Sequence, residues 1–234
     1  MLTIPEEALL AQARPFGRDL PDPQIWLREE PLAAGRLIEL ILSRRIAAGP
    51  TRGRLLYRET VRVVDATPTG DPLLDETLES VGADDRRTCA HWVKRLANGS
   101  RDAYLDRLVK RSLLRRDERG SDPKQYVADA DALAAIIERI RAVLEQPPAA
   151  DLRDAALVTL LGYAGALFPI LNELRWNPSA LIGDWLARRQ LDQAGRRAIE
   201  LYTNRAAGDW ELAAADGIRM IAFEAEPEGW TGGG

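Results

Sequence analysis

The chain has 234 residues, 46% hydrophobic and 29% charged, which are the proportions of an ordinary water-soluble globular protein. Its single cysteine, Cys89, excludes an internal disulfide and a zinc site made of cysteines alone, and it indicates a reducing compartment. The opening segment LTIPEEALL carries two acids and follows no basic segment, so we expect a cytoplasmic protein without a secretory signal.

The formal charge of −4 is unevenly distributed along the chain. Residues 28–62 carry +4, residues 94–119 carry +5, and the remainder carries −13. If the two basic segments meet in the fold, they form a surface that attracts anions; otherwise they are two separate solvated surfaces. Three of the 32 basic residues are lysines and the others are arginines, which together with abundant alanine indicates a bacterial source.

The first third of the chain predicts two helices and a short β-ribbon. TIPEEALLAQA has a capping box, because Thr3 can cap the helix, Pro5 suits its first turn and Glu6 follows three residues after the cap. Residues 31–48 have apolar residues at mixed helical spacing, which predicts a helix buried on more than one face. The β-rich runs of residues 53–65 predict the ribbon.

The stretch TPTGDPLLDETL, residues 67–78, predicts a turn followed by a helix that reaches about Val81. Asp71 is placed as an N-cap and Pro72 as the first helical residue. Asp75 and Glu76 would interact favourably with the helix dipole, so a catalytic pair of carboxylates is not required to explain them.

The rest of the chain is mostly helical. Residues 87–99 predict a helix that stops at Asn98-Gly99, residues 100–114 a second helix, and residues 115–129 at most a short hairpin. A nearly continuous apolar run within residues 151–171 predicts a long buried central helix, since about 20 apolar residues are needed to span a membrane. Further helices are expected in 129–145, 177–190, 191–206 and 209–225. The predicted fold class is therefore mainly α, with one helical domain over residues 1–225, one or two short β-hairpins, and a flexible tail, 226–234.

No set of residues predicts catalysis, a metal site or a cofactor. His91 lies beside Cys89 but has no second pair of ligands elsewhere, so a partly buried helix histidine is the better interpretation. Ser121 and Lys124 match S-x-x-K, but Pro123 lies between them in a turn-rich segment. We therefore expect a protein that is not an enzyme, although an enzyme built on this scaffold stays an alternative.

An ordered set of segments carries a resemblance to a known family: PTGDPLLDETL, LTIPEEALL, GRLIELILSRRI, WVKRLANG, LVKRSLLRRD, YVADADALAAIIERIRAVL and GDWELAAADGI. Together they resemble the Golgi phosphoprotein 3 family, whose bacterial members are mostly uncharacterised. The resemblance runs from about Leu2 to Phe223. It implies a mainly α-helical, non-enzymatic peripheral membrane protein that binds phosphatidylinositol 4-phosphate in eukaryotes and can oligomerise. The family's apolar membrane-inserting hairpin corresponds here to the polar RDERGSDPKQ, which predicts weak membrane binding by the protein alone.

The resemblance also implies a lipid site that this chain keeps in part. The second arginine of the family's pair matches Arg101, whereas the first falls on Asn98. The family's tryptophan matches Trp26 approximately, and its helix-start arginine falls on Ala33. Arg36, one turn further, and Arg28, in the preceding loop, could supply that charge. Arginine suits phosphate because its forked donors are permanently charged.

The expected partners are an anionic phospholipid or another phosphate-bearing ligand, with a protein partner or a second copy of the chain as further partners. A soluble interaction or regulatory subunit whose pocket has decayed or changed is the main alternative, because Asn98 and Ala33 depart from the family's pattern. Nucleic-acid binding through residues 100–116 is disfavoured, since the predicted hairpin beside that helix is short.

Overall fold

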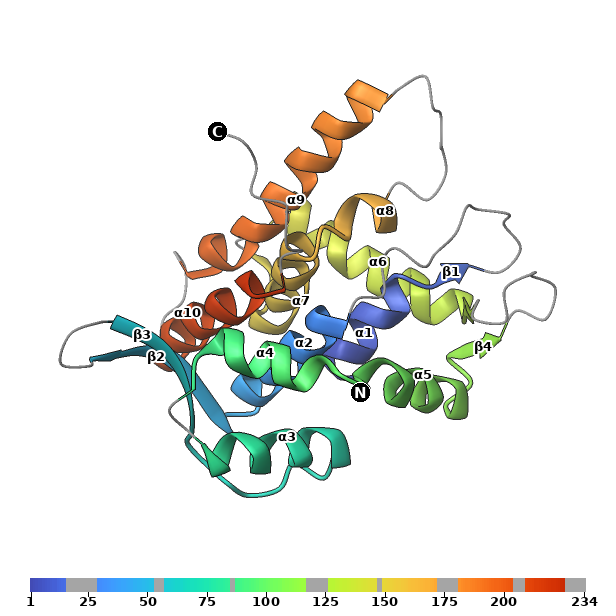
Figure 1. Ribbon diagram of the computed structural model, residues 1–234. Helices are drawn as coiled ribbons and strands as arrows, with labels where there is room; N and C mark the ends of the chain where they lie inside the picture. The colour runs from blue at the N-terminus through green and yellow to red at the C-terminus, as the bar shows by residue number, and fades with distance from the viewer. Residues whose placement is uncertain are drawn as a thin grey trace.

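In a computed structural model of the chain, the N-terminal helix α1 (Ile4–Ala11) lies at the centre of the molecule (Figure 1). Every residue of α1 is buried, and the helix contacts α2 (Glu29–Leu42), α5 (Ser100–Lys110), α6 (Ala130–Glu145) and α7 (Leu152–Tyr163). The Thr3 backbone N–H and hydroxyl donate to Glu6 Oε2 at 2.8 and 3.1 Å, which confirms the expected bonding of Glu6 back to the start of its helix. This short helix is thus enclosed by four others.

The structure describes residues 1–15, 29–52, 57–84, 87–116, 126–146, 149–171, 181–203 and 209–225. The other helices in these ranges are α3 (Pro72–Ala83), α4 (Cys89–Ala97), α8 (Leu167–Leu171), α9 (Leu181–Thr203) and α10 (Asp209–Phe223). The predicted fold class, a mainly α single domain, is confirmed. The predicted tail, residues 226–234, lies outside the described residues.

A β-hairpin follows α2 and differs from the prediction in its first strand. β2 (Ile46–Arg52) pairs antiparallel with β3 (Tyr57–Val63), whereas residues 46–48 were expected to continue the helix. The helix stops because Arg44 adopts a left-handed backbone (φ 60°) and the Arg45 N–H bonds to the Leu40 carbonyl. Ile46 and Ala48 are then buried, and α10 packs against β2.

The second sheet is short and confirms the small hairpin expected after α5. β4 (Leu114–Arg116) pairs antiparallel with β5 (Tyr126–Ala128), and β1 (Arg14–Pro15) pairs parallel with β5 on its other side. Residues 117–125, which carry the Ser121 and Lys124 match, lie outside the described residues.

The central apolar run forms two helices instead of one. α7 is the predicted buried central helix, but it ends at Tyr163, and Gly165 turns the chain with a left-handed φ of 66° before α8 begins. α7 crosses α9 at Gly162 and Gly195, where a Cβ on Gly162 would lie 2.7 Å from the backbone nitrogen of Arg196. The close approach of the two backbones therefore requires glycine.

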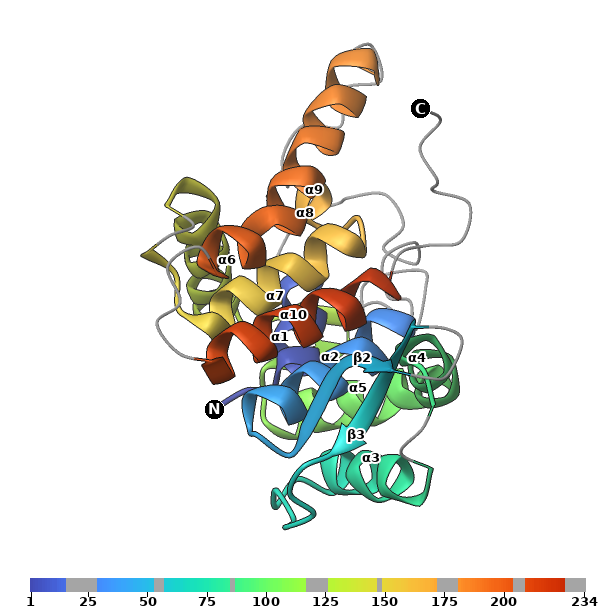
Figure 2. The ribbon, with the colours of Figure 1, turned by 90° about the vertical axis from the view of Figure 1, so that its left-hand side faces the viewer.

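The C-terminal region contains fewer helices than expected. Residues 181–203 form one continuous helix, α9, where the sequence predicted two, because no glycine or proline lies at their junction, Gln190-Leu191. Figure 2 shows α7, α9 and α10 together on one side of α1 and α2.

Candidate functional site

The first turns of α2 and α5 lie side by side. The Gly99 N–H at the start of α5 donates to Glu29 Oε2 at the start of α2, at 3.2 Å. Gly99 is the N-cap of α5 and has a left-handed φ of 77°, which confirms the predicted stop of α4 at Asn98-Gly99. The N-terminus of α5, with a partial charge of about +0.5, therefore already has the Glu29 carboxylate of α2 as a partner.

Arg101 lies in the first turn of α5, at this meeting point. Its side chain is partly exposed, while its Nε is buried and has no hydrogen-bond partner among the described residues. Of the neighbouring positions that the family's pattern singles out, Asn98 is exposed and Ala33 is completely buried within α2. Trp26 and Arg28 lie outside the described residues.

Arg36 is oriented inward, on the side of α2 that faces α3 and α5. Only 6% of Arg36 is exposed, and its guanidinium carbon lies 5.4 Å from the centre of the Tyr104 ring. Its Nη1 donates a long hydrogen bond of 3.5 Å to Thr77 Oγ1, and its Nε is buried without a partner among the described residues. Tyr104 follows Arg101 by about one helical turn, so the two lie on the same side of α5, and the Arg107 guanidinium also faces the Tyr104 ring, at 5.6 Å.

Tyr104 is completely buried, and its hydroxyl makes no hydrogen bond among the described residues. Burial raises the pKa of Tyr104 more than the nearby positive charges of Arg36 and Arg107 lower it. The hydroxyl is therefore neutral at physiological pH and can donate a proton to an acceptor.

A carboxylate–arginine cluster borders this region on the α3 side. Asp71 caps α3 by accepting from Leu73 N and Leu74 N, as predicted, and it also binds Arg107 of α5 through both oxygens, at 2.9 and 2.6 Å. Burial acts to raise the pKa of Asp71, but Arg107 and the two amides outweigh it and lower the pKa. The cap thus also fastens α3 to α5, a long-range contact that the spacing of the residues did not predict.

The two acids after this cap differ in what they do. Asp75 accepts from the backbone N–H and the hydroxyl of Thr69 at 2.6 and 2.7 Å and from the Gly70 N–H at 3.3 Å. These hydrogen bonds lower the pKa of Asp75. Glu76 is exposed. Asp75 therefore fixes the turn before α3, and the two carboxylates show no arrangement for catalysis.

Sequence reasoning missed the two buried glutamates of α1. Glu6 is fully buried and accepts from Arg107 and Arg111 of α5, each at 3.3 Å. Glu7 accepts from Arg139 of α6 at 2.7 Å and lies 3.5 Å from Arg153 of α7. Two adjacent acids in an otherwise apolar helix were the available signal, since buried charges require partners.

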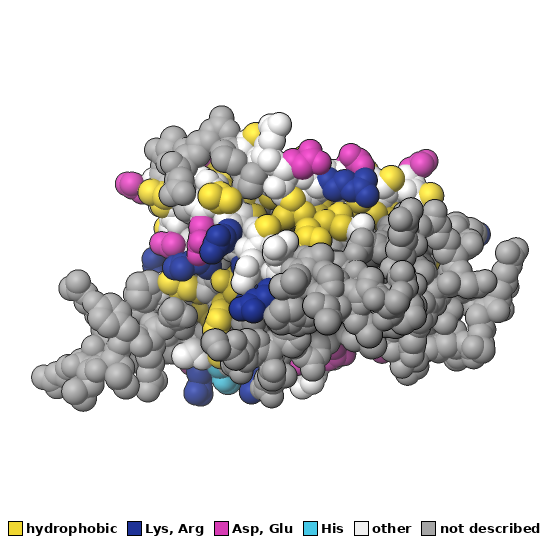
Figure 3. Space-filling view, turned by 90° about the horizontal axis from the view of Figure 1, so that it is seen from above, with side chains coloured by type: hydrophobic (Ala, Val, Ile, Leu, Met, Phe, Trp, Pro, Cys, Tyr) yellow, Lys and Arg dark blue, Asp and Glu magenta, His cyan; other side chains and the backbone are white. Residues whose placement is uncertain are grey.

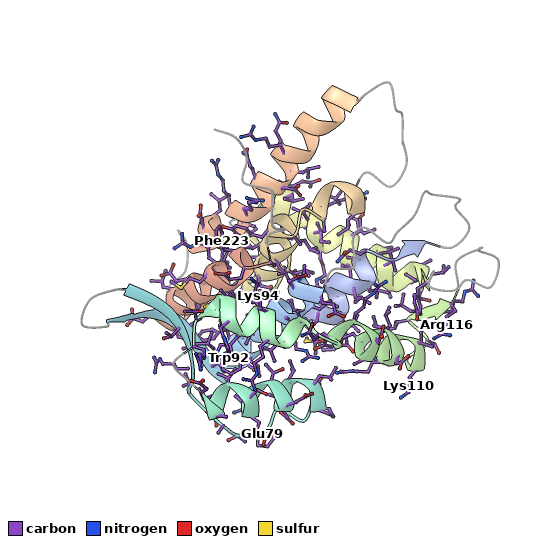
Figure 4. All side chains as sticks on the ribbon, viewed as in Figure 1. Glu79, Trp92, Lys94, Lys110, Arg116 and Phe223 are labelled. Carbon is purple, nitrogen blue, oxygen red and sulfur yellow. The ribbon has the colours of Figure 1, made fainter. Side chains whose placement is uncertain are left out.

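Among the described residues the two basic segments meet only in part, where Arg36 of the first lies against α5 of the second. At the far end of α2, about 21 Å from its start, Arg44 stacks on Trp210 and Arg45 pairs with Asp65. The exposed bases of the second segment follow α4, α5 and β4, and Figure 4 shows Lys110 and Arg116 at the same end of the molecule. The face seen from above in Figure 3 has apolar side chains between acidic and basic ones.

The described residues show no second kind of site. His91 is partly buried and packs edge-on against Trp92, as expected for a helix histidine. Within the described ranges no three His, Cys, Asp or Glu side chains are placed to hold a metal ion. In the same ranges no helix has the length and apolar character needed to cross a bilayer.

Comparison with known families gives one match. The model of the Golgi phosphoprotein 3 (GPP34) family matches residues 5–218, nearly the whole chain. A comparison with curated proteins found no match.

Proposed function

Because the chain belongs to the Golgi phosphoprotein 3 family, we propose that it is a bacterial, non-enzymatic adaptor that binds an anionic lipid headgroup of the phosphatidylinositol 4-phosphate type. Family membership fits a lipid-binding or adaptor role in general. The proposed ligands of the headgroup phosphate are Arg101, Arg36 and Arg28, with Trp26 beside them in the lipid interface. The protein would act in the cytoplasm, at the inner face of the membrane.

The observation that carries this proposal is the position of Arg101. It extends from the first turn of α5, two residues after the N-cap Gly99, and its Nε has no hydrogen-bond partner among the described residues. Helix N-termini and arginine both favour phosphate, the first through free amides and the dipole, the second through forked donors. An anion here would be bound by Arg101 and the N-terminal end of α5, in competition with Glu29, which accepts from the Gly99 N–H at 3.2 Å.

Co-sedimentation with vesicles at low salt tests the proposal. Wild-type protein should bind phosphatidylcholine vesicles only when they contain phosphatidylinositol 4-phosphate, and Arg101→Gln should weaken binding by about tenfold or more, as expected for a charge-assisted hydrogen bond. Arg116→Gln is the matched control, because it removes one exposed charge from β4, beyond the other end of α5. Absence of binding by the wild type, or equal losses in both variants, would contradict a specific site at Arg101.

The alternative is a soluble interaction or regulatory subunit that uses the same fold. The departures at Asn98 and Ala33 favour it, since they remove two of the family's phosphate ligands. It predicts a stable protein partner, or a second copy of the chain, whose binding is unchanged in Arg101→Gln.

A further inference from the structure

Arg36 differs from the partly buried arginines of α6 and α7. Arg153 pairs with Glu39 at 2.9 Å, and Arg139 pairs with Glu7 and Asp154. Arg36 is only 6% exposed, yet no carboxylate of the described residues lies within ion-pair distance of it. Its contacts there are the long hydrogen bond to Thr77 and the face of Tyr104.

A buried charge without a counter-charge costs stability, because the solvation that it loses is not replaced. The nearby carboxylates do not meet this need. Asp71 is bound by both terminal nitrogens of Arg107, and Glu6 is shared by Arg107 and Arg111. Arg36 thus has no counter-charge among the described residues, and beside it lies the Tyr104 hydroxyl, which is also buried and has no hydrogen-bond partner among them.

We propose that Arg36 and Tyr104 form the inner part of the anion site, and that a bound phosphate monoester supplies the missing negative charge. This inference rests on the proposed function, and it adds Tyr104 as a specificity-determining residue. Arg101 contacts the ligand at the surface, while Arg36 and the Tyr104 hydroxyl provide donors on its inner side. A monoester fits because it carries close to two negative charges and three acceptor oxygens.

The site distinguishes two kinds of phosphate by this chemistry. A phosphodiester, such as the linkage in phosphatidylglycerol, has one negative charge, and its two ester groups leave two free oxygens. With one charge and one free oxygen fewer, it would bind the donors of Arg101, Arg36 and Tyr104 more weakly than a monoester does. The Tyr104 hydroxyl would thus favour the monoester, whether that group belongs to a lipid headgroup or to a soluble phosphate compound.

The test compares thermal stability and phosphate binding in full-length variants. Arg36→Met keeps most of the side-chain volume and removes the charge. It should melt at or above the wild-type temperature without ligand, and it should bind glycerol 3-phosphate about tenfold or more weakly. Arg153→Met is the matched control and should lower the melting temperature, because it leaves Glu39 without its arginine and removes one of the two arginines beside Glu7. An Arg36→Met protein that melts as low as Arg153→Met, or that binds as tightly as the wild type, overturns the inference.

Two further variants keep the test decisive if Arg36→Met does not fold. Arg36→Lys keeps the charge and should retain part of the affinity. Tyr104→Phe removes only the hydroxyl and should reduce the preference for vesicles containing phosphatidic acid, a monoester, over phosphatidylglycerol vesicles of equal surface charge. An unchanged preference in Tyr104→Phe overturns the role of the hydroxyl.

These experiments also distinguish a failure of this inference from a failure of the proposed function. If the wild type binds neither glycerol 3-phosphate nor any anionic vesicle, the proposed function fails, and this inference with it. If it binds and loses affinity in Arg101→Gln but not in Arg36→Met, only the inference fails. Binding of the soluble monoester without vesicle binding supports the inner site and assigns the ligand to a soluble phosphate compound.

Discussion

The two sides of α5 use arginine in opposite ways. On the side facing α1, Arg107 and Arg111 bind the buried carboxylate of Glu6, and every charge has a partner of opposite sign. On the side facing α2, Arg36 and Arg101 have buried nitrogens without partners among the described residues. The first arrangement holds helices together, whereas the second leaves donors available to an external anion.

This contrast indicates how structural arginines can be told from ligand-binding ones in a chain so rich in this residue. Burial alone does not separate them, since Arg36 and Arg153 are both largely buried. The two kinds of arginine differ in whether a carboxylate lies within ion-pair distance. Removing the carboxylate from a buried paired arginine destabilises the native state, while an arginine buried without a carboxylate has a cost that a bound anion would offset.

The strongest test of the paired side is Glu6→Ala, the change with the largest expected effect. It removes a fully buried carboxylate from Arg107 and Arg111 and an acceptor from the N–H of Thr3. We expect the free energy of unfolding to fall by about 3–5 kcal/mol, as when one partner of a buried ion pair is removed. Urea denaturation measures it.

Glu76→Ala serves as its control, because Glu76 is an exposed glutamate in the first turns of α3. It should change stability by no more than about 0.5 kcal/mol. Similar losses in the two variants would mean that the Glu6 contacts do not hold α5 to α1.

An intermediate effect is expected for Asp71→Asn, which removes the ion pair between Asp71 and Arg107 next to the candidate site. Asparagine caps helices as well as aspartate does, so the change mainly removes the charged bonds to Arg107. The expected loss at neutral pH is about 1–3 kcal/mol.

The pH dependence of that difference gives a separate check. The folded pKa of Asp71 lies below its ordinary value of 3.8, so its carboxylate contributes stability above that value. The contribution is lost as the pH falls from 3.8 through the lowered folded pKa. Urea denaturation over this range should show wild type and Asp71→Asn converging in acid, and a gap that does not change with pH would contradict the ion pair.

The parts of this fold that depend on neighbours in sequence were predictable. The bonding of Glu6 to Thr3, the Asp71 cap and the glycine stop at Gly99 each require residues within one helical turn. The ion pairs were not predictable, because Glu6 and Arg111 are 105 residues apart and meet only after α1 and α5 pack. The break at Gly165 was missed because a glycine in an apolar run is also compatible with a continuous helix.

The candidate site, too, was predictable from the sequence only in part. The sequence indicated Arg101 and Arg36 as neighbouring positive charges through the family's pattern. It could not indicate that Arg36 turns toward Tyr104, because that orientation depends on how α5 packs against α2. The sequence pattern does not distinguish Tyr104 from other apolar residues of its helix, since a tyrosine ring gives the same pattern whether or not its hydroxyl finds a partner.

The smallest expected effect, that of Arg111→Ala, sharpens the contrast between the two sides. Arg111 is 41% exposed, and Arg107 continues to neutralise Glu6 when Arg111 is removed. Urea denaturation should therefore show a loss of about 0.5 kcal/mol or less, the usual value for an exposed pair. A small loss here beside a large one in Glu6→Ala would identify the buried carboxylate as the group on which the contact between α1 and α5 depends. A loss above about 2 kcal/mol would instead mean that Glu6 needs both arginines. In that case the buried carboxylate of Glu6 requires two arginines. Arg36, which has no carboxylate beside it among the described residues, would then contrast still more strongly with the arginines of α5.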